Sequence, residues 1–131
     1  MPQLRIIHIA LCLSAAIITA LFGALRTLMP EMVVGLPSYV PFVFLGLSAM
    51  VILSAAAFRT TIPPVDAAAG EEAWLAAGRG KAVALWALSE GGVMLAALAF
   101  FFGANPWLAG GFAAGGLGFM ASQSPGTLAG H

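Results

Sequence analysis

Apolar residues along this chain fall into four long runs, each bounded by charged residues, prolines or glycines. A helix needs roughly 20 mostly apolar residues to cross the hydrocarbon core of a bilayer. The pattern predicts such helices over residues 6–28, 36–58, 82–103 and 107–121. The fourth run is the shortest and is rich in glycine. An all-α bundle of four transmembrane helices, forming one domain over residues 1–131, is therefore expected.

The connections between the runs differ in length and chemistry. Residues 59–81 form a long loop in which Pro63-Pro64 interrupts any helix that continues from the second run. A separate short helix is expected from Glu71, with Trp74 as an anchor at the level of the lipid headgroups. Asn105-Pro106 predicts a tight turn between the third and fourth runs.

The distribution of basic residues predicts the orientation of the spans. Arg5, Arg59, Arg79 and Lys81 fall at one side of the predicted bundle, and Arg26 falls at the other. Because Lys and Arg accumulate in cytoplasmic loops, both termini and the long loop are expected in the cytoplasm. A signal peptide is the alternative interpretation of the first run. Its apolar stretch is longer than the usual apolar region of about 7–15 residues, which favours a retained helix.

Composition supports a membrane protein and disfavours several functions. Hydrophobic residues make up 61% of the chain and charged residues 8%, far outside the usual range of soluble domains. Five basic residues balance five acidic ones, so the chain lacks the basic surface that nucleic-acid binding requires. The only aspartate, Asp66, lies in the long loop, so no hydrolytic triad can be assembled. We expect neither an enzyme nor a bound cofactor.

Small residues recur at helical spacing and predict how the helices pack. Membrane helices associate through close contact between small residues, so such a row is expected to face another helix. In the first run, small and polar residues share one side, and Ile6, Ile9, Leu13, Ile17, Leu21 and Leu28 share the other, which is expected to face lipid. The predicted packing positions are Cys12, Ala16, Gly23, Gly91, Gly111 and Gly115.

Glu90 is an acidic residue inside the third apolar run. An acid at this depth costs about 2.5–3.5 kcal/mol on insertion scales, so it is expected to face the interior of the bundle. Two interpretations remain open. Glu90 either carries a proton or cation across the membrane, or it stays protonated and donates a hydrogen bond to a serine or a backbone carbonyl on another helix, which holds the helices together. Counting inward from the span ends places four residues of the first two spans at a depth comparable to that of Glu90: Cys12, Ala16, Ser48 and Met50. Ser48 is the nearest polar side chain by depth.

His8 and Cys12 are spaced by four residues and share a helix face, a spacing that can provide two metal ligands. Two ligands do not complete a site. The preferred interpretation is a histidine at the headgroup level beside a packed thiol, and no metal site is expected.

The stretch from Arg79 and Lys81 to Ala87-Leu88-Ser89-Glu90-Gly91 resembles a group of small, uncharacterised bacterial four-helix membrane proteins. These proteins share an Ala-Leu-x-Glu-Gly or Ala-Leu-x-Glu-Ala pattern in helix three and a following Gly-Asn turn, which Gly103-Ala104-Asn105 is similar to. The resemblance implies a four-helix architecture in the bacterial inner membrane and no settled activity. The same stretch is faintly similar to the ion-binding helix of ATP synthase c subunits, but those have their glycine-rich helix before the acidic one.

Together these observations favour a structural or accessory membrane protein that lies in the lipid bilayer. It is expected to pack with copies of itself or with a larger membrane complex, with Glu90 as a polar determinant of packing. A minimal proton-coupled transporter or ion-translocating oligomer that uses Glu90 as carrier is the alternative.

Overall fold

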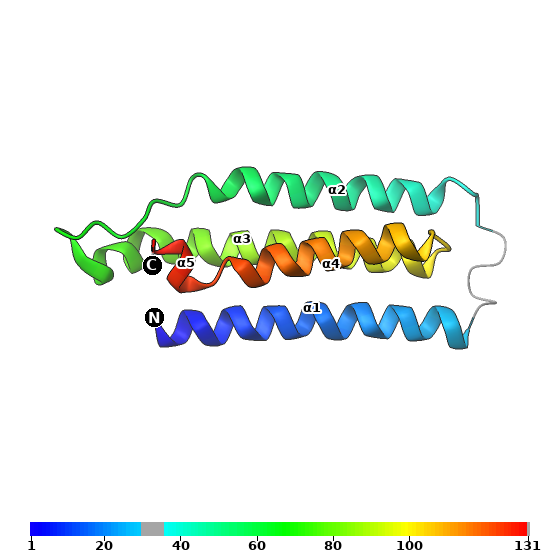
Figure 1. Cartoon of the computed structure of the whole chain (residues 1–131), viewed down its shortest axis with the longest axis horizontal. Coiled ribbons are helices and arrows are strands. Elements are labelled where there is room, and N and C mark those ends of the chain that lie inside the picture. Colours follow the sequence, from blue (N-terminus) through cyan, green and yellow to red (C-terminus); the bar gives the residue numbers. More distant parts are fainter. Residues whose placement is uncertain (30–35, 131) are drawn as a thin grey trace.

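The computed structural model describes residues 1–29 and 36–130 and contains only helices as regular structure over that part of the chain. The expected all-α class is confirmed. The helices, in chain order, are α1 (Pro2–Leu28), α2 (Val40–Arg59), α3 (Gly70–Phe101), α4 (Pro106–Ser122) and the single-turn α5 (Pro125–Leu128) (Figure 1). Of these, α1, α2 and α3 are long and apolar enough to cross a membrane. The chain is thus a small helical membrane protein with three candidate spans.

The helix α3 is the centre of the bundle and packs against α1, α2 and α4. In Figure 1, α1 and α2 lie on opposite sides of the molecule, with α3 and α4 between them. Trp86, Leu85 and Val93 of α3 and Met120 of α4 are completely buried where these helices meet. The start of α1 and the short helix α5 lie at the same end of the bundle.

The helix α4 is shorter than the other three. Its 17 residues extend about 25 Å at 1.5 Å per residue, less than the roughly 30 Å of a typical hydrocarbon core. Its bounds contain the predicted fourth run, 107–121. It does not count among the three candidate spans, so the structure supports four substantial helices and three spans.

The ends of α1 and α2 differ from the predicted bounds. Pro2 opens α1, so this helix begins four residues before the predicted start at residue 6. The helix α2 begins at Val40 instead of residue 36, since Pro37 lies in the turn before it and Pro41 occupies its first turn. Proline lacks an N–H donor and is tolerated best at such a first turn. Residues 30–35, where the first connection was expected, lie outside the described part of the chain.

The start of α3 corrects the expectation for the long loop. A separate short helix was predicted from Glu71, but one continuous helix runs from Gly70 to Phe101, so the loop covers only residues 60–69. Trp74 was predicted as a headgroup anchor, but it is only 4% exposed and its Nε1 donates to the carbonyl of Pro63 at 2.7 Å. This tertiary contact fixes the first turns of α3 against the loop.

The turn between α3 and α4 matches its prediction. Gly103 adopts a φ of +104°, which glycine tolerates without steric cost, and it ends α3. The N–H of Ala104 bonds the carbonyl of Ala99 at 2.9 Å, which closes a Schellman turn. The Asn105 side chain then accepts from the N–H of Trp107 at 2.9 Å and caps α4.

Candidate functional site

The Glu90 carboxylate links α3 to α1. Its Oε1 accepts a hydrogen bond from Ser14 Oγ at 2.8 Å. Ser14 lies in the middle of α1, and the bond joins residues 76 positions apart in the sequence. Glu90 therefore does bond a serine on another helix, as the packing interpretation predicted, but with Ser14 as the donor.

Glu90 lies deep within the predicted membrane region and is still partly exposed. It precedes Phe101, the last residue of α3, by eleven residues, or about 16 Å at 1.5 Å per residue. That is close to the middle of a hydrocarbon core of about 30 Å. The side chain lies at the seam between α1 and α3 and is half-buried. In a single chain, part of the Glu90 side chain would therefore be exposed to lipid near the middle of the bilayer.

Ser48, which depth alone suggested as the partner of Glu90, does not bond Glu90. Its hydroxyl is fully buried and donates to the carbonyl oxygen of Gly92 at 2.6 Å, which joins α2 to α3. Sequence reasoning missed Ser14. The available signal was a hydroxyl in an apolar run, between Cys12 and Ala16, both of which depth counting had placed level with Glu90.

Two glycines form a notch that receives Ile52 of α2. A Cβ added at Gly92 of α3 would lie 2.5 Å from Cγ1 of Ile52. A Cβ added at Gly116 of α4 would lie 2.7 Å from Cγ2 of Val93 and 3.2 Å from Cδ1 of Ile52. Neither position accommodates a side chain without movement of its neighbours. Glycine at both positions lets α2, α3 and α4 approach closely.

The predicted packing positions on α1 and α3 have different environments. Cys12 is half-buried against the core, and its Sγ lies 3.7 Å from Nε2 of His8. A Cβ added at Gly23 would lie 3.9 Å from Cε1 of Phe100, and one added at Gly91 would lie 4.0 Å from Cγ1 of Val51, both ordinary contact distances. Ala16 is exposed, and the neighbouring Ala15 is fully buried.

The predicted row on α4 lies outside the bundle. Gly111 and Gly115 are exposed, and a Cβ added at either one would meet no atom within 4 Å. The buried positions of α4 are Ala109, Ala113, Gly116 and Met120. Packing within the described part of the chain therefore does not require glycine at these two positions, which border a shallow groove beside Ala49 and Leu53 of α2.

His8 belongs to a group that caps the end of α4. Its Nε2 donates to the carbonyl of Met120 at 2.7 Å, and its ring lies 4.8 Å from that of Trp86. Trp86 Nε1 and Arg59 Nε donate to the backbone and side-chain oxygens of Gln123, each at 2.7 Å. Three helices thus supply donors to the C-terminal end of α4. These groups stabilise a helix end and explain why His8 is buried.

Metal binding at His8 and Cys12 has no support from further ligands. Within residues 1–29 and 36–130, no three His, Cys, Asp or Glu side chains lie close enough together to hold a metal ion. The ring nitrogen of His8 nearest to Cys12 already bonds Met120.

No protein-family model, no curated protein and no solved structure matches this chain.

Proposed function

We propose that this chain is a small structural or accessory protein of the bacterial inner membrane, which associates with copies of itself or with a larger membrane complex. In this proposal α4 crosses the membrane as a fourth span, and both termini lie in the cytoplasm. The distribution of basic residues and the resemblance of the Ala87–Gly91 stretch support this placement.

The single observation that carries the proposal is the position of Glu90. Its hydrogen bond with Ser14 holds α1 on α3, and interhelical bonds of this kind contribute on the order of 1 kcal/mol in membranes. The half-buried carboxylate would still meet lipid in a single chain, which is costly at this depth. Association with another protein would remove that cost by covering the seam between α1 and α3.

The outer face of α4 supports association independently. A Cβ added at Gly111 or Gly115 would have no neighbour within 4 Å, so packing within the chain does not require their small size. Small residues on the lipid-facing side of a helix let a second helix approach closely. Close packing against another protein would explain why glycine occupies these two positions.

The first experiment determines whether an assembly exists. The full chain carrying an affinity tag is extracted from native membranes with a mild detergent, and the captured material is analysed by native mass spectrometry. We expect either a discrete homo-oligomer or a stoichiometric partner. Recovery of monomer alone, also after reconstitution into lipid nanodiscs, would contradict the proposal.

A carrier function of Glu90 is the second candidate, favoured by its partial exposure. Within the described residues Oε2 of Glu90 has no hydrogen-bond partner, so this oxygen is available to a proton or cation. An infrared titration of the reconstituted protein tests it, with Glu90→Gln as control. A protonated-carboxyl band that is absent from the variant and disappears reversibly as pH rises would favour the carrier. A band or carboxylate signal that stays constant would favour the packing role.

A further inference from the structure

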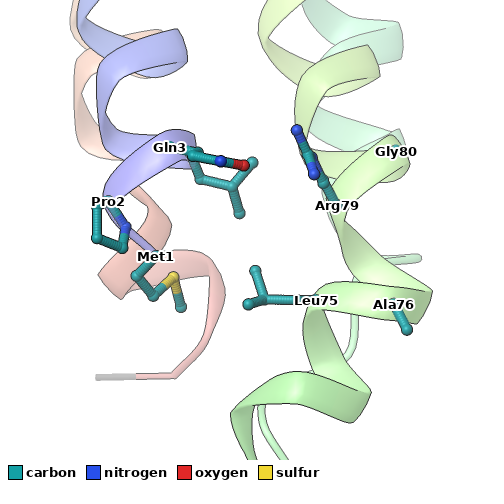
Figure 2. Close-up of a pocket in the computed structure, with 8 residues that line it drawn as sticks. Met1, Pro2, Gln3, Leu75, Ala76, Arg79 and Gly80 are labelled. Atoms are coloured by element: carbon teal, nitrogen blue, oxygen red, sulfur yellow. The ribbon is translucent and has the colours of Figure 1, made fainter.

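A cavity of about 720 Å³ opens between the start of α1 and the first turns of α3. Its lining residues are Met1, Pro2, Gln3, Leu4, Leu75, Ala76, Arg79 and Gly80. In Figure 2 the Gln3 side chain reaches from α1 toward α3, and Arg79 and Leu75 project from the facing wall. The cavity thus has two polar side chains on opposite walls, and the N-terminal ammonium of Met1, a third polar group of the lining residues, pairs with Glu71 Oε1 at 3.4 Å.

Arg79 is the charged side chain of this lining, and its guanidinium is exposed. Within the described residues it forms neither a hydrogen bond nor an ion pair. Three other cations of the chain are engaged, and the Arg5 side chain, which lies outside this cavity, also has no partner among the described residues. Arg26 donates to the carbonyl of Phe100 at 2.8 Å, Arg59 to Gln123 at 2.7 Å, and Lys81 to the carbonyl of Thr61 at 3.1 Å. Arg79 is therefore available to an external anion.

The depth of Arg79 indicates which anion it meets. It precedes Phe101 by 22 residues, or about 33 Å of helix at 1.5 Å per residue. A hydrocarbon core spans about 30 Å, so a helix that crosses it from Phe101 places Arg79 just beyond, among the headgroups. Glu72 lies on the same side of α3, about 10 Å farther from the membrane. The positive charge is therefore on the membrane side of the negative one.

We propose that this cavity binds the phosphate of an anionic phospholipid. Arg79 would pair with the phosphate, since a guanidinium matches phosphate oxygens with two parallel donors. The Gln3 amide would donate to a remaining phosphate or ester oxygen from the opposite wall. Leu75 and the Met1 side chain provide apolar surface for the glycerol and the first acyl carbons. Basic pockets between membrane helices are known to bind anionic headgroups.

The test measures which lipids stay bound to the full chain. Wild type and variants are reconstituted into nanodiscs that contain equal amounts of phosphatidylglycerol and phosphatidylcholine, and native mass spectrometry records the lipids retained after release. We expect wild type to retain phosphatidylglycerol preferentially, and Arg79→Gln to reduce this retention about tenfold, because the variant loses the charge-assisted hydrogen bonds between the guanidinium and the phosphate. Arg79→Lys is expected to retain an intermediate preference.

Arg5→Gln is the matched control. It removes the same charge at the same end of the bundle, from an exposed side chain outside this cavity. Retention should be unchanged in this variant. Equal losses in Arg5→Gln and Arg79→Gln would indicate a diffuse charge effect and overturn the site. Circular dichroism of each variant shows whether the helices are intact. If Arg79→Gln does not fold, the lipid retention of Arg79→Lys tests the site in its place.

A soluble phosphate could offer the same chemistry, so a separate measurement distinguishes the two sources. Inorganic phosphate is titrated against the protein in nanodiscs of phosphatidylcholine alone and followed by ³¹P NMR. The proposal expects no saturable binding. Saturable binding of inorganic phosphate that Arg79→Gln abolishes, without lipid selectivity, would overturn the lipid assignment.

Discussion

The two sides of α4 use the same residue type in opposite ways. On the inner side Gly116, together with Gly92 of α3, leaves a notch that Ile52 fills, and an added Cβ at either glycine would collide with a neighbour. On the outer side Gly111 and Gly115 have open space around them. Gly115 and Gly116 are adjacent in sequence, so one step of about 100° around the helix separates a required glycine from a replaceable one.

This difference shows what a Gly-x-x-x-Gly spacing can and cannot establish. The spacing places small residues on one row of a helix, and close helix contact is the usual use of such a row. It does not state which of several rows faces the bundle. In α4 the inward row is Ala109, Ala113, Gly116 and Met120, and the glycine pair with the recognisable spacing faces outward. An outward row is available for another chain.

The largest expected effect comes from filling the inner notch. Gly92→Ala places a Cβ 2.5 Å from Cγ1 of Ile52, and Gly116→Ala places one 2.7 Å from Cγ2 of Val93. Overpacking of this kind costs about 1–3 kcal/mol. We expect the free energy of unfolding to fall by that amount in each variant, measured by reversible unfolding in mixed micelles with tryptophan fluorescence as signal.

A double-mutant cycle identifies the clash as the cause. Ile52→Ala removes the atoms that a Cβ at Gly92 would meet, so the double variant should lose less stability than the sum of the single variants. Strict additivity would mean that Ile52 does not occupy the notch.

The next effect concerns the outer side of α4 and changes association instead of folding. Gly111→Leu combined with Gly115→Leu adds bulk where the single chain has open space. We expect self-association or partner binding to weaken at least about tenfold, which corresponds to about 1.4 kcal/mol. Energy transfer between labelled chains diluted in liposomes measures self-association, and affinity capture measures binding to another protein.

Gly46→Leu is the matched control for this prediction. Gly46 is an exposed glycine of α2, and a Cβ added there also meets no atom within 4 Å. It should leave association intact. If both sets of leucines weaken association equally, the outer face of α4 is not the specific contact.

A smaller effect is expected from the polar bond between α1 and α3. Ser14→Ala removes the donor to Glu90, and interhelical hydrogen bonds in membranes contribute about 0.6 kcal/mol on average and up to about 1.7 kcal/mol. The unfolding free energy should fall within that range. Ser54→Ala is the control, because Ser54 donates to Met50 of its own helix. Equal losses in both variants would show that the bond to Glu90 does not hold the helices together.

The lipid-facing side of α1 could be predicted from the sequence, because its apolar residues recur at helical spacing along one face. All six apolar residues that were expected to face lipid are exposed: Ile6, Ile9, Leu13, Ile17, Leu21 and Leu28. Helical periodicity depends on local geometry alone, so it transfers directly from sequence to structure. The tight turn at Asn105-Pro106 was predictable for the same reason.

The partner of Glu90 and the start of α3 could not be predicted in this way. Depth counting identified the correct turn of α1, but contact with Ser14 also depends on the rotation of α1 against α3, which residue spacing does not set. The first turns of α3 depend on Trp74, which packs on Gly78 and bonds the loop at Pro63. Such contacts between distant segments override weak local signals for a helix start.

Gly115→Ala gives the smallest effect and separates the two sides of α4 most directly. Because nothing lies within 4 Å of the added Cβ, the single chain should lose no stability, and it should gain up to about 0.5–1 kcal/mol, since alanine orders a helix at lower entropic cost than glycine. Gly116→Ala, one residue on, should show the opposite sign in the same unfolding measurement. If Gly115→Ala also weakens association while the stability of the isolated chain rises, Gly115 contacts another chain. A loss of stability in the isolated chain would mean that α4 is rotated relative to the described packing.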